Sequence, residues 1–175
     1  MDKEASMDVA LYGTDEARTT PRLLVAGALS AELECGNLRH IRYGGLEIIR
    51  AISFVVRDRD WGTCVPRIDD LSVREQAGRV EVSYTASIDE KGQRLCYAVR
   101  IVCTPDELSF SGEARPLTDF TTNRTGFVVL HPLVGVVGRA ATVEHVDGRI
   151  EETRFPEAIA PLQPMMELRA ITHEP

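Results

Sequence analysis

The residues best suited to chemistry lie between Thr118 and Pro156. In this stretch Arg124 precedes an apolar run that ends at His131. A guanidinium binds a carboxylate through two parallel hydrogen bonds, and an imidazole acts as a general base near neutral pH. If the ligand carries a carboxylate, the pattern makes Arg124 and Asp119 candidate substrate-binding residues and His131 a candidate general base.

A structural interpretation of the same residues stays open. Asn123 and Gly126 can shape a turn, while Arg124 pairs with Asp119 at the surface. His131 is then a hydrogen-bonded histidine beside the core residues of its strand, which is the more common role of a lone histidine.

The Asp147-Gly148 pair separates two strand-like runs, Ala141 to Val146 and Arg149 to Phe155. Both turn residues tolerate a positive φ, so the pattern predicts a type I′ hairpin with Val146 opposite Arg149. This turn fixes a register for the whole hairpin.

The predicted register assigns polar side chains to the two faces of the hairpin. Glu144 lies opposite Glu151 on one face, where the carboxylates repel unless an arginine, a cation or a proton neutralises them. His145 and Glu152 share the other face and form a candidate acid/base or hydrogen-bonding pair. A solvated hairpin face is the alternative. The candidate catalytic residues are accordingly His131, His145, Glu144 and Glu152.

Charges alternate from Arg57 to Asp60 ahead of Trp61, the single tryptophan. If this segment stays extended, Arg57, Arg59 and Trp61 share a face. An aromatic ring packs against the C–H face of a sugar, so Trp61 and Arg59 are candidate substrate-binding residues. A core or interface role for Trp61 is the alternative.

Other catalytic patterns are missing from the sequence. It has no GxSxG nucleophile elbow, and its four histidines show neither HxxxH nor HxH spacing, so we expect no metal and no cofactor. The four cysteines form no CxxC pair and fit free thiols in a reducing compartment.

Charge and hydropathy narrow the partners and the location. A net charge of -7 opposes binding to nucleic acid or to an anionic membrane, because phosphates need a basic surface. No basic segment followed by an apolar core marks a signal peptide near the N-terminus. The longest apolar run, Phe127 to Val137, is interrupted and too short to span a bilayer. We therefore expect a cytoplasmic protein.

The elements that position these residues are predicted to be strands. Apolar and polar residues alternate, as from Val80 to Ser87, and no window has a helical period. Gly44-Gly45 and Ala77-Gly78 mark tight hairpins. The run from Leu46 to Val56 is apolar on both faces, which is typical of a central strand, here with room for a bulge.

We therefore expect an all-β fold, with about a dozen strands in a two-sheet antiparallel sandwich. A flexible N-terminal arm over residues 1–20, with a short strand near Val9, precedes a single sandwich domain over residues 21–175.

Six long strings carry a family resemblance: LYGTDE (11–16), GNLRHIRYGGLEIIR (36–50), ISFVVRDRDWGT (52–63), PLTDFTTNRTGFVVLHPLVGVVGR (116–139), VEHVDGRIEETRFPE (143–157) and the closing LQPMMELRAITHEP. They resemble the N-terminal domain of the D-apionate lactonase family, and the likeness is weakest between residues 64 and 115. The resemblance implies opening of the lactone of an apiose-derived acid in sugar catabolism. It also implies that an N-terminal β-sandwich precedes a barrel-like domain and a further β domain.

The leading hypothesis is an accessory β-sandwich of a sugar-acid lactonase, with catalysis in downstream domains of the same polypeptide. It would supply walls of a substrate pocket or a surface for homo-oligomers. The first alternative is a stand-alone, galactose-mutarotase-like sugar-binding protein or epimerase, which the architecture also resembles. That enzyme would use His131 or His145 with Glu144 or Glu152. The second alternative is a purely structural packing domain.

Overall fold

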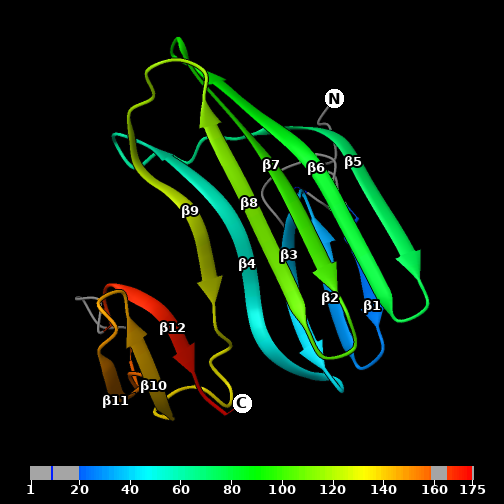
Figure 1. The fold of residues 1–175 in the computed structure, drawn as a ribbon, viewed down its shortest axis with the longest axis vertical. Coiled ribbons are helices and arrows are strands. Elements are labelled where there is room, and N and C mark those ends of the chain that lie inside the picture. The colour runs from blue at the N-terminus through cyan, green and yellow to red at the C-terminus, as the bar shows by residue number, and fades with distance from the viewer. Residues whose placement is uncertain (1–8, 10–19, 159–164, 175) are drawn as a thin grey trace, which may run out of the picture.

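The computed structural model describes residue 9 and residues 20–158 and 165–174. The predicted N-terminal arm, with its short strand, lies outside the described residues except for Val9 and Thr20. The elements of the described part are twelve β-strands in three antiparallel sheets (Figure 1). None of these elements is a helix of the length and apolarity needed to cross a membrane.

Two of the sheets form the predicted sandwich. The first has the order β1-β2-β3-β4-β9, with β1 (Arg22–Ala26), β2 (Leu29–Glu34), β3 (Asn37–Tyr43), β4 (Leu46–Asp58) and β9 (Thr122–Leu130). The second has the order β5-β6-β7-β8, with β5 (Arg67–Gln76), β6 (Arg79–Glu90), β7 (Gln93–Cys103) and β8 (Leu108–Pro116). The predicted all-β sandwich is therefore confirmed.

The core between these sheets is formed by strands in which buried and more exposed residues alternate. Every second residue of β6 from Val80 to Ile88, and of β7 from Leu95 to Cys103, is buried. These side chains pack against buried residues of the first sheet such as Leu24, Leu38 and Ile41. Burial of alternate residues on facing sheets is the main source of stability in such a fold.

The predicted details of the hairpins hold in most places. Gly44-Gly45 and Ala77-Gly78 join β3 to β4 and β5 to β6. The ladder of β3 and β4 pairs Ile41 with Ile49 and Arg42 with Glu47, which leaves one extra residue on β4. The bulge considered for this strand is therefore present, and it lets β4 bend around the sandwich (Figure 1).

A small third sheet follows the sandwich in the sequence. It has the order β11-β10-β12, with β10 (Ala140–His145), β11 (Ile150–Arg154) and β12 (Leu168–Thr172). Its buried residues, Ala141, Val143 and His145, and the buried Val136 of the preceding link are not part of the core of the sandwich. In Figure 1 this small sheet lies beside the C-terminal end of β9.

Candidate functional site

The link between β4 and β5 turns sharply after Asp58. The Asp58 carboxylate accepts hydrogen bonds from the backbone N–H groups of Asp60 (2.9 Å) and Gly62 (2.7 Å). Lys91 Nζ donates a further bond to the same carboxylate at 3.1 Å. These donors, led by Lys91, hold the pKa of Asp58 below its usual value.

This turn holds Trp61 in an uncommon conformation at the surface. The residue is 53% exposed and has a φ of +70°, a left-handed value that is rare for a large aromatic residue. The guanidinium carbon of Arg124, on β9, lies 5.2 Å from the centroid of the Trp61 ring, a cation–π contact. The extended conformation considered for Arg57 to Trp61 is therefore wrong beyond Asp58. The arginine that stacks on Trp61 is Arg124 and not Arg59.

A second arginine shares this position. Arg57 is the ladder partner of Arg124 across β4 and β9, so both side chains leave the same face of the sheet. Arg57 Nη1 donates to the Trp61 carbonyl (3.1 Å) and to the Thr63 hydroxyl (3.1 Å). Within the described ranges, neither arginine has a carboxylate partner. We call Arg57, Trp61 and Arg124 the Trp61 site.

The other two predicted binding residues lie outside this contact. Arg59 is exposed, with its Nε 3.7 Å from Asp60 Oδ1, and it lines a cavity of about 220 Å³ with Lys91 and Gln93. Asp119 is exposed, and its backbone carbonyl accepts a bond from the Thr118 hydroxyl (3.3 Å). The ion pair of Asp119 with Arg124, considered as a structural alternative, is not among the contacts of the described residues.

The hairpin of β10 and β11 closes differently from the prediction. The His145 carbonyl accepts a bond from the Gly148 N–H (3.0 Å), and the His145 N–H donates to the Arg149 carbonyl (2.9 Å). Gly148, with a φ of +85°, has a left-handed conformation, whereas Asp147 does not. Asp147 instead caps the Arg149 N–H at 2.9 Å. The loop is thus a three-residue turn that ends in a left-handed glycine, and the predicted type I′ turn is wrong.

The longer loop moves the pairing by one residue. Glu144 lies opposite Ile150, and Val143 lies opposite Glu151. A shift of one residue places a strand's side chains against different partners, so Glu144 and Glu151 are on opposite faces. The predicted repulsive pair of Glu144 with Glu151 and the predicted pair of His145 with Glu152 are therefore both wrong.

His145 lies instead at the centre of a different contact. Its Nε2 is 3.0 Å from Glu151 Oε2, and its Nδ1 is 2.9 Å from the Met166 carbonyl. Arg149 Nη1 donates to the same Glu151 oxygen at 2.9 Å. The bonds from Arg149 and then from His145 hold the pKa of Glu151 below its usual value. His145 is 4% exposed, and both of its ring nitrogens are used.

The two glutamates predicted as catalytic partners make structural contacts. Glu144 Oε1 forms an ion pair with Arg169 Nη1 of β12 at 3.2 Å. Both carboxylate oxygens of Glu152 lie 3.0 Å from the Thr142 hydroxyl. These contacts join the three strands of the small sheet.

His131 lies in an aromatic cluster at the end of β9. Its ring centroid is 5.3 Å from Phe155 and 5.1 Å from His173. Its Nδ1 is buried without a hydrogen-bond partner in the described part of the chain. Burial, and secondly the charge of His173, lower the pKa of His131. A neutral ring that packs between aromatic neighbours fits the structural role better than that of a base.

The predicted site residues thus fall into separate groups. Arg124 and Leu130 are six steps apart along an extended strand, a span of about 20 Å, so the Trp61 site is far from the His131 cluster. The ring nitrogens of His145 contact Met166 and Glu151, which belong to neither group. In the ranges the structure covers, no three histidine, cysteine, aspartate or glutamate side chains come together as a metal site.

Sequence reasoning missed three partners. Arg57 meets Arg124 only because β4 pairs with β9, and Glu151 reaches His145 only through the observed register. His173 packs on His131 although the two are far apart in the sequence. For the pairing of His145 with Glu151, the sequence offered one local signal. A left-handed glycine also ends three-residue hairpin loops, which are the next most common type, so Asp147-Gly148 was compatible with the observed register.

The fold and the Trp61 site define a β-sandwich module that carries an arginine-flanked tryptophan. The sequence profile of the family described as D-apionate lactonase, N-terminal domain, matches residues 9–175. The chain therefore belongs to this family.

A curated relative supports the assignment. The D-apionate lactonase of Brucella anthropi is 46% identical over 166 residues, which cover 94% of this chain and 27% of the relative. The chain thus spans about a quarter of the length of that relative. No solved structure matches the chain significantly.

Proposed function

We propose that this chain is the accessory β-sandwich of a sugar-acid lactonase and that its Trp61 site binds the carboxylate of the hydroxy acid. Catalysis would reside in a downstream part of the same polypeptide, because the matched region is only 27% of the lactonase it resembles. The buried, fully bonded His145 and the aromatic surroundings of His131 support an accessory role.

The observation that carries the proposal is the pair of uncompensated arginines at Trp61. Two guanidinium groups that face the same side of β4 and β9 repel each other, and an anion between them removes that repulsion. Arginine binds a carboxylate through two parallel bonds, and a tryptophan ring packs on C–H groups. A small carboxylate with a carbon chain uses both features.

Hydrolysis of a lactone creates such a ligand. The cyclic ester is neutral, whereas the product hydroxy acid carries a carboxylate. The Trp61 site is therefore expected to bind the product anion more tightly than a neutral sugar. The site would form one wall of the substrate pocket, with the catalytic groups supplied from outside the chain.

Binding can be measured by titrating the chain with D-gluconate and recording tryptophan fluorescence, because Trp61 is the only tryptophan. Saturable quenching is expected, and Arg124→Ala and Arg57→Ala should each weaken it by about 10-fold or more, since charge-assisted bonds contribute about 1.5–3 kcal/mol. Arg74→Ala removes an exposed arginine of β5 and serves as the matched control.

Two further ligands separate binding of the carboxylate from packing of the carbon chain on Trp61: xylitol has the chain without the charge, and acetate has the charge without the chain. Weak binding of both, with tight binding of gluconate, fits a site that reads charge and carbon chain together. Equal binding of xylitol and gluconate, or unchanged binding in Arg124→Ala, would refute the carboxylate site.

We further propose a cytoplasmic location. The four cysteines are free, and Cys64 and Cys103 are buried. Burial raises the pKa of the Cys103 thiol to about 11, which keeps it as an inert thiol. Unpaired thiols of this kind fit a reducing compartment.

A further inference from the structure

Strand β9 exposes apolar side chains on both of its faces. Phe127, Val128, Val129 and Leu130 are 43%, 41%, 46% and 51% exposed. Edge strand β1 differs, because its exposed Leu23 and Val25 alternate with buried Leu24 and Ala26. A continuous apolar run is typical of a strand that is covered on both faces, and β9 is not covered in this way here.

The exposed apolar surface continues beyond the end of the strand. Leu133, Val134 and Val137 are 76%, 89% and 42% exposed. We call these three residues and Phe127 to Leu130 the β9 strip. No charged residue interrupts it between positions 127 and 137. Isolated exposed apolar residues are normal, but seven of them within eleven consecutive positions favour an interaction surface.

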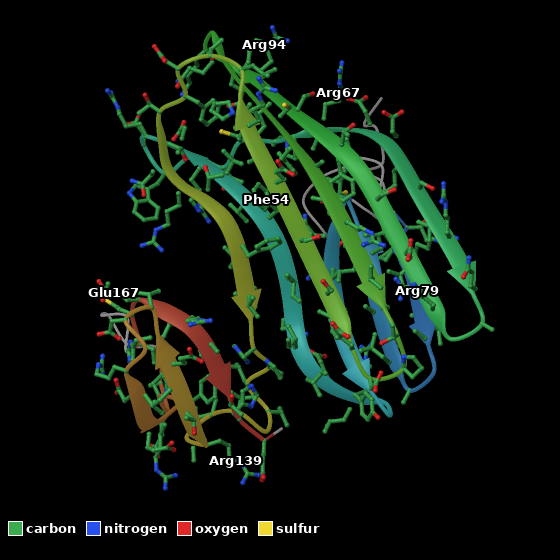
Figure 2. All side chains as sticks on the ribbon, in the orientation of Figure 1. Phe54, Arg67, Arg79, Arg94, Arg139 and Glu167 are labelled. Atoms are coloured by element: carbon green, nitrogen blue, oxygen red, sulfur yellow. The ribbon has the colours of Figure 1, made fainter. Side chains whose placement is uncertain are left out.

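The backbone of β9 is also available. β9 is the last strand of its sheet and pairs only with β4 among the described strands, so its other edge presents free N–H and C=O groups. Figure 1 shows β9 along one flank of the sandwich. Figure 2 labels Phe54 of β4, the ladder partner of Phe127, and shows no further described strand of the sandwich on the other side of β9.

We infer that the β9 strip is the docking surface for the remainder of the lactonase polypeptide, the part that lies outside the matched region in the curated relative. This inference rests on the proposal that the chain is one module of a longer enzyme. The partner face would be apolar and would bury the strip and pair with, or cover, the free edge of β9.

Two observations favour this occupant over a second copy of the chain. Nearly three quarters of the relative's length lies outside the matched region, so an enzyme of this family has a large partner in the same polypeptide. The segment that follows β12 brings His173 onto His131, with ring centroids 5.1 Å apart, and His131 precedes Leu133 by two positions in the sequence. Self-association would instead bring together two chains that each carry a net charge of -7.

Hydrogen–deuterium exchange tests the inference. The 175-residue chain is compared with a full-length polypeptide in which this chain replaces the matched region of the Brucella anthropi relative. The amides of residues 126–137 are expected to exchange at least about 10-fold more slowly in the full-length polypeptide, because their edge is covered. Strand β5, the outer strand of the other sheet, is the internal control and should not change.

A pair of substitutions links the protection to the side chains. Leu133→Asp with Val134→Asp should abolish the protection in the full-length polypeptide. Both residues are at least 76% exposed, so the isolated chain should keep its thermal unfolding temperature. Leu71→Asp on β5, at a residue that is 51% exposed, is the matched control and should leave the protection intact.

Two results would overturn the inference. One is equal exchange of residues 126–137 in both polypeptides. The other is protection in the isolated chain that grows with its concentration, which assigns the strip to a second copy. Neither readout depends on sugar-acid binding, so failure here is distinct from failure of the Trp61 site.

Discussion

His145, a predicted catalytic residue, has both of its ring nitrogens engaged by other groups of the protein. The Met166 carbonyl can only accept a hydrogen bond, so Nδ1 must donate to it. Glu151 Oε2, which also accepts a bond from Arg149 Nη1, lies 3.0 Å from Nε2. The ring thus links β10, β11 and the segment before β12, and it has no free nitrogen for a substrate.

The dependence of the free energy of unfolding on pH, below neutral pH, should reveal the contacts of Glu151 with Arg149 and His145. The pKa of Glu151 is lower in the folded state, so its contribution is present above the ordinary glutamate pKa of about 4.3 and is lost as the pH falls through the folded pKa. We expect the free energy of unfolding of the wild type to exceed that of Glu151→Gln near neutral pH. The difference should shrink as the pH falls below the ordinary glutamate pKa of about 4.3. Urea unfolding at several pH values measures it.

Glu152→Gln is the control for this prediction. Its carboxylate contacts the Thr142 hydroxyl on the other face of the hairpin, and the substitution changes the net charge by the same amount. A difference between wild type and Glu151→Gln that stays constant with pH would contradict the role given to Arg149 and His145.

At the scale of elements, the loop of the β10–β11 hairpin determines the partners of its side chains. Because the loop contains one residue more than predicted, His145 contacts Glu151 and not the predicted Glu152. The same effect appears after Asp58, where a carboxylate that caps two backbone N–H groups ended the strand and turned Trp61 toward Arg124. Short polar residues at strand ends therefore control which side chains meet.

Gly148 tests the hairpin loop. Its φ of +85° is strained for other residues, and a Cβ there would meet no atom within 4 Å, so the cost of Gly148→Ala is conformational. We expect Gly148→Ala to lower the free energy of unfolding of the small sheet by about 1–2 kcal/mol. Urea unfolding followed by exchange of the β10 amides measures this cost.

Gly148→Asn is the matched variant, because asparagine tolerates the left-handed conformation. It should recover most of the loss. Equal losses in both variants would mean that contacts of the glycine, and not its conformation, determine the effect.

At the scale of the whole molecule, the chain combines a well-packed sandwich with features that are incomplete alone. The Trp61 site has two arginines without a carboxylate partner in the described ranges, and the β9 strip is apolar and uncovered. Both lie on strands β4 and β9 or on the links that follow them. A module that completes its site and its surface against another part of the enzyme accounts for both features.

Lactone hydrolysis is the corresponding prediction. The 175-residue chain alone should show no hydrolysis of D-apionolactone above the spontaneous rate, whereas the Brucella anthropi lactonase serves as the positive control. Release of acid measured at constant pH follows the reaction. Hydrolysis by the chain alone that is lost in His145→Ala or His131→Ala would favour the stand-alone enzyme instead.

The sequence by itself determined the class of fold and most of its strands. Alternation along residues such as Val80 to Ile88 and glycine pairs such as Gly44-Gly45 are local signals, because the two-residue period and the turn conformations depend on neighbours in the chain. The family resemblance was likewise present in the sequence and is confirmed by the profile match.

Only the tertiary structure decided which functional side chains meet. Arg57 and Arg124 are brought together by pairing of strands distant in the sequence, and His145 met Glu151 because the loop took one more residue than the local signal predicted. Packing also left β9 at an edge, where an apolar run that looks like a buried strand stays exposed. Such contacts depend on strand order and register, which the pattern within one strand does not contain.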